Sequence, residues 1–157
     1  MNHVVNIYRP CVAALLVNAA GRLLVAERRD FRESWQFPQG GIDKGETAVA
    51  ALVREMGEEL SLGAEDFAIE EQRGGYRYDF PSTHRRWGKY CGQEQTYFRC
   101  RFTGKDEAID LATEHPEFGR WKWIRPEEFQ ITWLPEFKRE VYRKVLRDFF
   151  QVERAEG

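Results

Sequence analysis

Apolar positions along the chain predict a β-sheet before any chemistry is considered. Two nearly unbroken apolar runs, at residues 11–17 and 23–29, flank a turn at residues 18–21. Runs without polar alternation are typical of strands that are buried on both faces, so we expect helices on both sides of the sheet. Further strands are predicted at residues 67–73, 76–80 and 95–102, and around Trp121 and Trp123.

Helical spacing of apolar residues predicts two helices. The first follows Thr47, a suitable N-cap, and its buried stripe consists of Val49, Leu52, Val53, Met56 and Leu60. The second starts near Pro135, and its stripe consists of Phe137, Val141, Val145 and Phe149. On this pattern alone Phe137 belongs to the core, whereas Lys138 and Arg139 belong to the surface.

The first predicted helix concentrates carboxylates on one face. Glu55, Glu58 and Glu59 stand at positions i, i+3 and i+4, which places them side by side on a helix. Like charges at this spacing repel each other unless a cation lies among them. Carboxylate oxygens without a nearby histidine or cysteine favour a hard ion such as Mg²⁺ or Mn²⁺. An acidic face that is only solvated explains the same spacing, so this helix alone leaves both interpretations open.

Length, composition and charge narrow the class of protein. The 157 residues suit one domain, and a composition of 42% hydrophobic and 32% charged residues is typical of a soluble globular protein. No apolar run approaches the ~20 residues of a transmembrane helix, and residues 1–8 lack the pattern of a signal peptide. Three cysteines without metal-ligand spacing predict reduced thiols and a cytoplasmic location. The net charge of −2 excludes a generally basic nucleic-acid-binding surface but not a local basic pocket, and no feature indicates an obligate protein partner.

The segment at residues 40–62 resembles the signature of the Nudix hydrolases, which cleave nucleoside diphosphates linked to another group. The match consists of Gly40, Glu46, Arg54, Glu55, Met56, Glu58, Glu59 and Leu62. One position differs, because Ser61 stands where the family usually has the glycine that ends the helix. Either Ser61 adopts the left-handed conformation, at a cost of about 1 kcal/mol or more, or Gly63 makes the turn instead.

Short segments along most of the chain are similar to one branch of this family, which holds bacterial RNA 5′-pyrophosphohydrolases and plant-type diadenosine tetraphosphate hydrolases. They are YRP at 8–10, SWQFPQGGI at 34–42, RYDFP at 77–81, GQEQ at 92–95, PEF at 116–118, WKW at 121–123 and FKREVY at 137–142. The resemblance implies an α/β protein with the Nudix fold, an α/β/α sandwich around a mixed β-sheet. It also implies that residues 1–157 form a single Nudix hydrolase domain.

The same resemblance implies roles for individual residues. Mg²⁺, or Mn²⁺ as a possible substitute, would be held by Glu55, Glu58, Glu59, Glu117 and the backbone carbonyl of Gly40. Arg54 would orient the carboxylates through charge-assisted hydrogen bonds, and either Glu55 or Glu117 would accept a proton. The nucleotide and its phosphates would contact Arg9, Tyr78, Gln93, Phe137 and Lys138. For Phe137 this role replaces the core position that helical spacing suggests.

The implied function is Mg²⁺-dependent hydrolysis of a P–O–P bond in a nucleotide 5′-polyphosphate. The first expectation is the triphosphate or diphosphate end of RNA, because Phe137 before Lys138 is more similar to the RNA enzymes. The net charge of −2 and the lack of a basic tail favour the alternative, a dinucleoside tetraphosphate. Two further alternatives, a Nudix module that binds without cleaving and a structural protein with a solvated acidic helix, fit the complete set of acidic residues less well. The polar segment 82–92, with His84, Arg85, Arg86 and Lys89, is either a phosphate-contacting loop or a solvated one.

Overall fold

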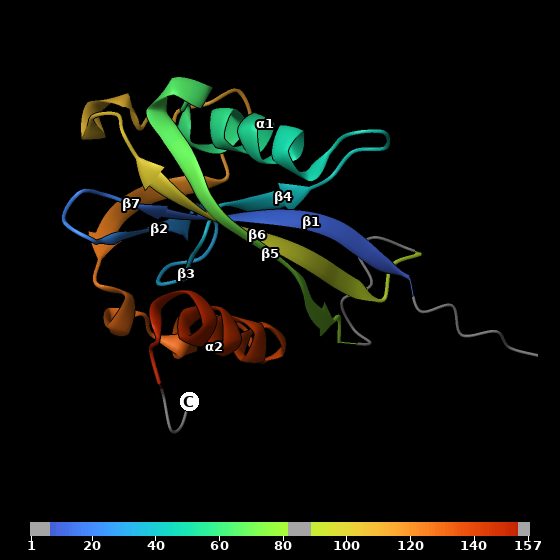
Figure 1. The fold of residues 1–157 in the computed structure, drawn as a ribbon. Coiled ribbons are helices and arrows are strands. Elements are labelled where there is room, and N and C mark those ends of the chain that lie inside the picture. The colour runs from blue at the N-terminus through green and yellow to red at the C-terminus, as the bar shows by residue number, and fades with distance from the viewer. Residues whose placement is uncertain (1–6, 82–88, 154–157) are drawn as a thin grey trace, which may run out of the picture.

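Two helices cover opposite faces of a twisted sheet (Figure 1). The computed structural model describes residues 7–81 and 89–153, so most of the polar segment considered above, including His84, Arg85 and Arg86, lies outside the described residues. Helix α1 (Ala48–Leu60) lies on one face and helix α2 (Glu136–Phe150) on the other. This arrangement confirms the expected α/β/α sandwich.

The sheet is mixed, as the sequence predicts. Its strands are β1 (Tyr8–Val17), β2 (Leu23–Arg28), β3 (Trp35–Gln36), β4 (Gln39–Gly41), β5 (Phe67–Asp79), β6 (Gly92–Phe102) and β7 (Phe118–Ile124). Their order is β3-β2-β1-β6-β5, with β4 also paired to β1 and β7 to β2. The β1–β6 pair is parallel and runs in register from Tyr8 opposite Gly92 to Val17 opposite Arg101, whereas the other pairs are antiparallel. Four short 3-10 helices complete the described elements: η1 (Ala64–Asp66), η2 (Asp106–Ala108), η3 (Pro126–Glu128) and η4 (Ile131–Trp133).

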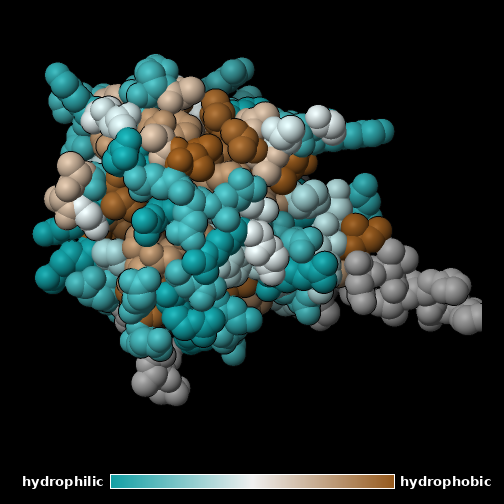
Figure 2. Space-filling model, viewed as in Figure 1, coloured by the Kyte–Doolittle hydropathy of each residue, from teal (hydrophilic) through white to brown (hydrophobic). Residues whose placement is uncertain are grey.

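The central strand β1 is buried on both faces and separates two hydrophobic clusters. Ala13 and Leu15 pack in the cluster on the α2 side, whereas Val12, Ala14 and Leu16 pack in the cluster on the α1 side. This confirms the expectation drawn from the unbroken apolar run, because a strand with helices on both sides has no polar face. On the face shown in Figure 2 most side chains are hydrophilic, and apolar side chains gather over α1.

Two segments differ from the sequence expectation. The strands predicted at residues 67–73 and 76–80 form one strand, β5, because β6 pairs along the whole length and a register irregularity absorbs the intervening glycines. Gly75 has a φ of 86°, a conformation that a glycine adopts without a steric penalty. The segment before α1 contains the short strands β3 and β4, which the apolar pattern does not predict. Its aromatic residues Trp35 and Phe37 are buried.

Neither helix among the described residues is long and apolar enough to cross a membrane.

Helix α1 begins and ends at identifiable capping groups. The Thr47 hydroxyl accepts a hydrogen bond from the Ala50 amide at 3.1 Å, which confirms the predicted N-cap. At the other end Ser61, not Gly63, takes the left-handed conformation, with φ 63° and ψ 24°. The Ser61 hydroxyl donates to the Asp110 carbonyl at 2.7 Å, a contact that offsets part of the conformational cost.

Substitution of Ser61 can separate the cost of the left-handed conformation from the contribution of the hydroxyl hydrogen bond. We expect Ser61→Ala to lower the free energy of unfolding by about 1 kcal/mol, because it keeps the strained conformation and loses the hydroxyl contact. Ser61→Gly also loses this contact but relieves the strain, so it should lie closer to the wild type than Ser61→Ala does. Urea denaturation of the three proteins measures the order. Equal stability of Ser61→Ala and the wild type would show that the Asp110 contact contributes nothing.

Candidate functional site

Three glutamates of α1 form a compact acidic cluster. Oxygens of Glu55, Glu58 and Glu59 lie within 4.8 Å of one another. Glu55 and Glu59 are buried, with 8% and 9% of their surfaces exposed, whereas Glu58 is exposed. The i, i+3, i+4 spacing therefore gathers the carboxylates as the sequence predicts, and burial makes their mutual repulsion stronger than on a solvated helix face.

Burial and repulsion make the charged state of this cluster unfavourable without a counterion. Desolvation, together with the charges of Glu58 and Glu117, raises the pKa of Glu55 to about 7 although Arg54 opposes the shift. Desolvation and the charge of Glu117 likewise raise the pKa of Glu59. Glu117, which directly precedes β7, thus lies beside the α1 carboxylates despite its distance in sequence. Its position adds a further oxygen donor to the cluster.

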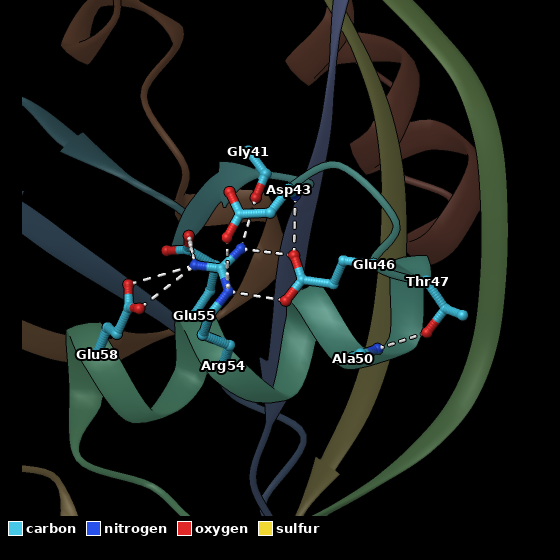
Figure 3. Close-up of polar contacts among 8 residues, drawn as sticks. All are labelled: Gly41, Asp43, Glu46, Thr47, Ala50, Arg54, Glu55 and Glu58. Carbon is cyan, nitrogen blue, oxygen red and sulfur yellow. Dashed lines mark hydrogen bonds and ion pairs between the residues drawn. The ribbon is translucent and has the colours of Figure 1, made fainter.

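The Arg54 guanidinium contacts Glu55 and connects α1 to the segment that precedes it (Figure 3). It forms a bidentate pair with Glu46, at 2.8 and 2.9 Å, and donates to the Gly41 carbonyl at 2.8 Å. It also donates to Glu55 at 2.9 Å and approaches Glu58 at 3.4 Å. A planar guanidinium with several donors is suited to such a fork, because each N–H points at a different acceptor.

Glu46 is a positioning residue that the sequence identified only as part of the signature. Its carboxylate accepts hydrogen bonds from Arg54 and, at 2.9 Å, from the Asp43 amide. The Arg54 hydrogen bonds, followed by that of the Asp43 amide, lower the pKa of Glu46 to about 2. Glu46 therefore stays ionised and holds Arg54 in place against Glu55.

The acidic cluster fits a divalent cation on two structural grounds besides its charge. One oxygen of Glu59 is buried without a hydrogen-bond partner among the described residues, as expected of an atom that binds an ion. Gly40 approaches the cluster so closely that a Cβ atom there would overlap the Glu55 carboxyl group. The donor set consists of oxygen atoms, which hard divalent ions prefer.

A cavity of about 810 Å³ adjoins the cluster and contains the residues assigned to the substrate. Its wall includes Arg9, Tyr78, Gln93, Phe137 and Lys138, together with Gly40, Glu55, Glu58, Glu59 and Glu117. The parallel β1–β6 pair places Arg9 directly opposite Gln93, which explains how residues so distant in sequence share one wall. Arg54 is not part of the wall, consistent with a role in positioning carboxylates.

Phe137 belongs to the core and to the cavity at once. Its half-buried ring packs against the hydrophobic cluster under α2, and its centroid lies 5.6 Å from that of Tyr78. Lys138 is also half-buried, with its ammonium group 5.9 Å from both ring centroids. Lys138 and Arg139, which helical spacing places on the surface, are half-buried, because the start of α2 packs over the end of β5.

Several cavity residues were not identified from the sequence. Arg28 is the last residue of β2, Phe31 and Arg32 come from the segment between β2 and β3, and Gln39 comes from β4. The Arg28 guanidinium lies 4.7 Å from the centroid of the Phe31 ring. No spacing rule marks such loop residues, although three arginines within the five residues 28–32 were a compositional signal.

The link between Glu46 and the metal site can be tested through metal affinity. Glu46→Gln loses the ionic pair with Arg54, which leaves Glu55 less well oriented, so we expect the Kd for Mn²⁺ to rise about 10-fold. Electron paramagnetic resonance of free Mn²⁺ measures the change. Glu71→Gln, which removes the carboxylate bonded to Arg73 at 2.6 Å on β5, is the matched control and should leave the Kd unchanged. An unchanged Kd in Glu46→Gln would contradict the positioning role.

Comparison with known proteins assigns the chain to a family. Residues 7–148 match the family described as NUDIX domain. The chain is 44% identical to the RNA pyrophosphohydrolase of Sphingopyxis alaskensis over 148 residues, which cover 90% of this chain and 92% of that protein. It is 45% identical to the RNA pyrophosphohydrolase of Erythrobacter litoralis over 150 residues, which cover 90% of each chain.

Solved structures share the fold at low sequence identity. The dihydroneopterin triphosphate pyrophosphohydrolase of E. coli has a TM-score of 0.64 and 19% identity, covering 92% of this chain and 97% of that chain. The Ap4A hydrolase of C. elegans in a binary complex has a TM-score of 0.59 and 20% identity, covering 86% and 94%. The signature on α1, the family match and the close relatives lead to one conclusion: this chain belongs to the NUDIX domain family.

Proposed function

We propose that this protein is a Mg²⁺-dependent hydrolase that removes pyrophosphate or phosphate from the 5′-triphosphate or 5′-diphosphate end of RNA. The observation that carries the proposal is one cavity in which an acidic cluster meets cationic and aromatic side chains. Glu55, Glu58 and Glu59 line it together with Arg9 and Lys138. Such a cavity suits a substrate with an anionic polyphosphate next to a flat nucleobase.

The choice of RNA is supported by the relatives that are similar over nine-tenths of both chains, which are named RNA pyrophosphohydrolases. The three cysteines, of which Cys11 and Cys100 are buried, are free thiols in the structure. Free thiols suit a reducing compartment, which supports the cytoplasmic location we propose.

The chemistry that we propose starts from the charge of the substrate. An anionic phosphorus centre repels a nucleophile, and a bound Mg²⁺, or Mn²⁺ in its place, would neutralise phosphate oxygens and acidify a water molecule. Glu55, Glu58, Glu59, Glu117 and the Gly40 carbonyl would hold the ion. Glu55 or Glu117 accepts the proton of the attacking water as its oxygen bonds to phosphorus and the P–O bond to the leaving phosphate breaks.

The remaining wall residues bind and orient the substrate. Arg9 and Lys138 offer positive charge to the polyphosphate, and Gln93 offers a hydrogen bond. The Tyr78 and Phe137 rings, tilted by 55° to each other, provide apolar contacts for the base. Arg54, held by Glu46, keeps Glu55 aligned, so the proton acceptor is in place before the substrate arrives.

A dinucleoside tetraphosphate such as Ap4A is the second candidate substrate. The net charge of −2 favours it, because a small dinucleotide needs no basic track outside the cavity. The similarity to the C. elegans Ap4A hydrolase, at 20% identity, supports the shared fold only. A module that binds without cleaving fits less well, because the full set of acidic residues is retained around the cavity.

Removing one carboxylate tests the metal role without disturbing the core. We expect Glu58→Gln to lower kcat/KM at least about 100-fold, because an ionic ligand becomes a neutral one. The side chain of Glu58 is 55% exposed, so the melting temperature should stay the same or rise as repulsion falls. Glu140→Gln, an exposed carboxylate on α2, is the matched control. Full activity of Glu58→Gln would refute the assignment.

The identity of the substrate can be tested by comparing two substrates at several salt concentrations. We expect kcat/KM to be higher for 5′-triphosphorylated RNA than for Ap4A, with pyrophosphate or phosphate released from the RNA. If about three RNA phosphates are bound, kcat/KM should fall roughly 20-fold between 50 and 200 mM salt, and less for Ap4A. A preference for Ap4A at every salt concentration would favour the second candidate. Cleavage of neither substrate would refute both.

A further inference from the structure

A buried amide on β6 connects the core to the cavity. Gln95 is 1% exposed, and its side-chain nitrogen donates to the side-chain oxygens of Gln39, at 2.5 Å, and Gln93, at 3.1 Å. Its own side-chain oxygen accepts a hydrogen bond from the fully buried Tyr97 hydroxyl at 2.9 Å. Gln39 and Gln93 line the cavity, whereas Gln95 and Tyr97 lie behind its wall.

The Tyr97 hydroxyl determines which end of the Gln95 amide faces the cavity wall. A hydroxyl proton needs an acceptor when it is buried, and the described residues provide the Gln95 oxygen for it. With this oxygen committed to Tyr97, both N–H groups of Gln95 point at Gln39 and Gln93. Rotating the Gln95 amide by half a turn would leave the Tyr97 proton without this acceptor, so the observed orientation is the favoured one.

The orientation of the Gln95 amide also determines how the Gln39 and Gln93 amides are oriented. Because Gln39 and Gln93 each present their oxygen to Gln95, the nitrogen of each side chain is left on the opposite side. These nitrogens make no hydrogen bond with any described residue, yet they are not among the buried polar atoms that lack a partner. They are therefore exposed to the cavity as hydrogen-bond donors.

The surroundings of these donors match an anion. Gln39 directly precedes Gly40, which touches the acidic cluster, and Gln93 lies opposite Arg9 across the β1–β6 pair. The Arg9 guanidinium packs on Gly41 in the same wall. Two amide N–H groups thus share the cavity wall with the carboxylates and an arginine, where the proposed polyphosphate would extend.

We propose that Gln95 is a positioning residue that holds Gln39 and Gln93 with their N–H donors directed at the oxygen atoms of the substrate's polyphosphate. This inference rests on the proposed function, because it takes the polyphosphate as the ligand of the cavity. The donors are oriented before binding, so no reorganisation is required when the anion enters. An amide oxygen turned toward a phosphate would repel it, which makes the direction of each amide decisive for affinity.

A double-mutant comparison tests whether Gln95 acts through the two cavity amides. Gln95→Met keeps the length of the side chain and removes its hydrogen bonds. We expect it to raise KM for 5′-triphosphorylated RNA about 10-fold in the wild type, with little change in kcat. In the background Gln39→Met/Gln93→Met, the same substitution should change KM less than about 2-fold, because the groups it orients are absent. Equal losses in both backgrounds would show a merely structural role and overturn the inference.

Tyr97→Phe provides a second route if Gln95→Met does not fold. It removes the hydroxyl that fixes the Gln95 amide and leaves every cavity side chain unchanged. We expect KM to rise in the wild type but not in the Gln39→Met/Gln93→Met background. A rise of equal size in both backgrounds would overturn the inference.

Failure of the positioning role can be told apart from failure of the proposed function. Calorimetric titration with inorganic tripolyphosphate, with Ca²⁺ in place of Mg²⁺, measures anion binding without RNA or turnover. Gln95→Met should raise this Kd about 10-fold. If the wild type binds tripolyphosphate but does not cleave RNA, the proposed function fails, and the Gln95 variants still test the positioning role of Gln95. If Gln95→Met binds tripolyphosphate as tightly as the wild type, the positioning role of Gln95 is refuted, whichever substrate the enzyme uses.

Discussion

Repulsion among the carboxylates of α1 is the constraint on which the rest of the site depends. Two of the three glutamates are buried, so solvent screens their charges poorly. Glu117, in the segment before β7, adds a further negative charge to the cluster. Arg54 offsets this repulsion from one side, while its bidentate pair with Glu46 prevents it from moving toward the cluster. A cation and an anionic ligand would occupy the side of the acidic cluster that faces the cavity.

The fold brings opposite charges from different elements to one cavity. The acidic groups lie mainly on α1, on one side of the sheet, and Lys138 comes from α2 on the other. Arg9 comes from the start of β1 between them. Because the parallel β1–β6 pair carries Arg9 and Gln93 to the same edge, the cavity has a cationic part and an acidic part. A phosphoanhydride bound across both parts would face a cation held by the acidic part at one end and hydrogen-bond donors at the other.

Polar groups behind the cavity wall extend this organisation into the core. Hydrogen bonds in a low-dielectric interior are strong when satisfied and costly when broken, so a buried amide next to a tyrosine has one favoured orientation. The chain Tyr97, Gln95, Gln39 and Gln93 transmits that orientation to the surface of the cavity. The core therefore contributes to the chemistry of the wall as well as to stability. Phe137 illustrates the same overlap, because its ring serves the hydrophobic cluster and the cavity together.

The sequence by itself determined the features that depend on neighbours along the chain. Apolar periodicity located the central strands and both helices, the i, i+3, i+4 spacing gathered Glu55, Glu58 and Glu59, and Thr47 was recognisable as the N-cap of α1. The resemblance of short segments to the Nudix family then led to Arg9, Gln93 and Glu117, which no local rule distinguishes. The predictions drawn from spacing succeed because helix and strand geometry fix which nearby residues share a face.

Only the tertiary structure decided the contacts between residues that are far apart in sequence. Because β4 and β6 both pair with β1, strand pairing brought Gln39 next to Gln95, and the pairing of β5 with β6 merged two predicted strands into one. The packing of α2 against the end of β5 placed the half-buried Lys138 over the Tyr78 ring. At the end of α1, the long-range contact of Ser61 with the Asp110 carbonyl accompanies a conformation that serine disfavours. Each of these outcomes depends on which elements pack together, a choice made by the whole hydrophobic core and not by any short segment.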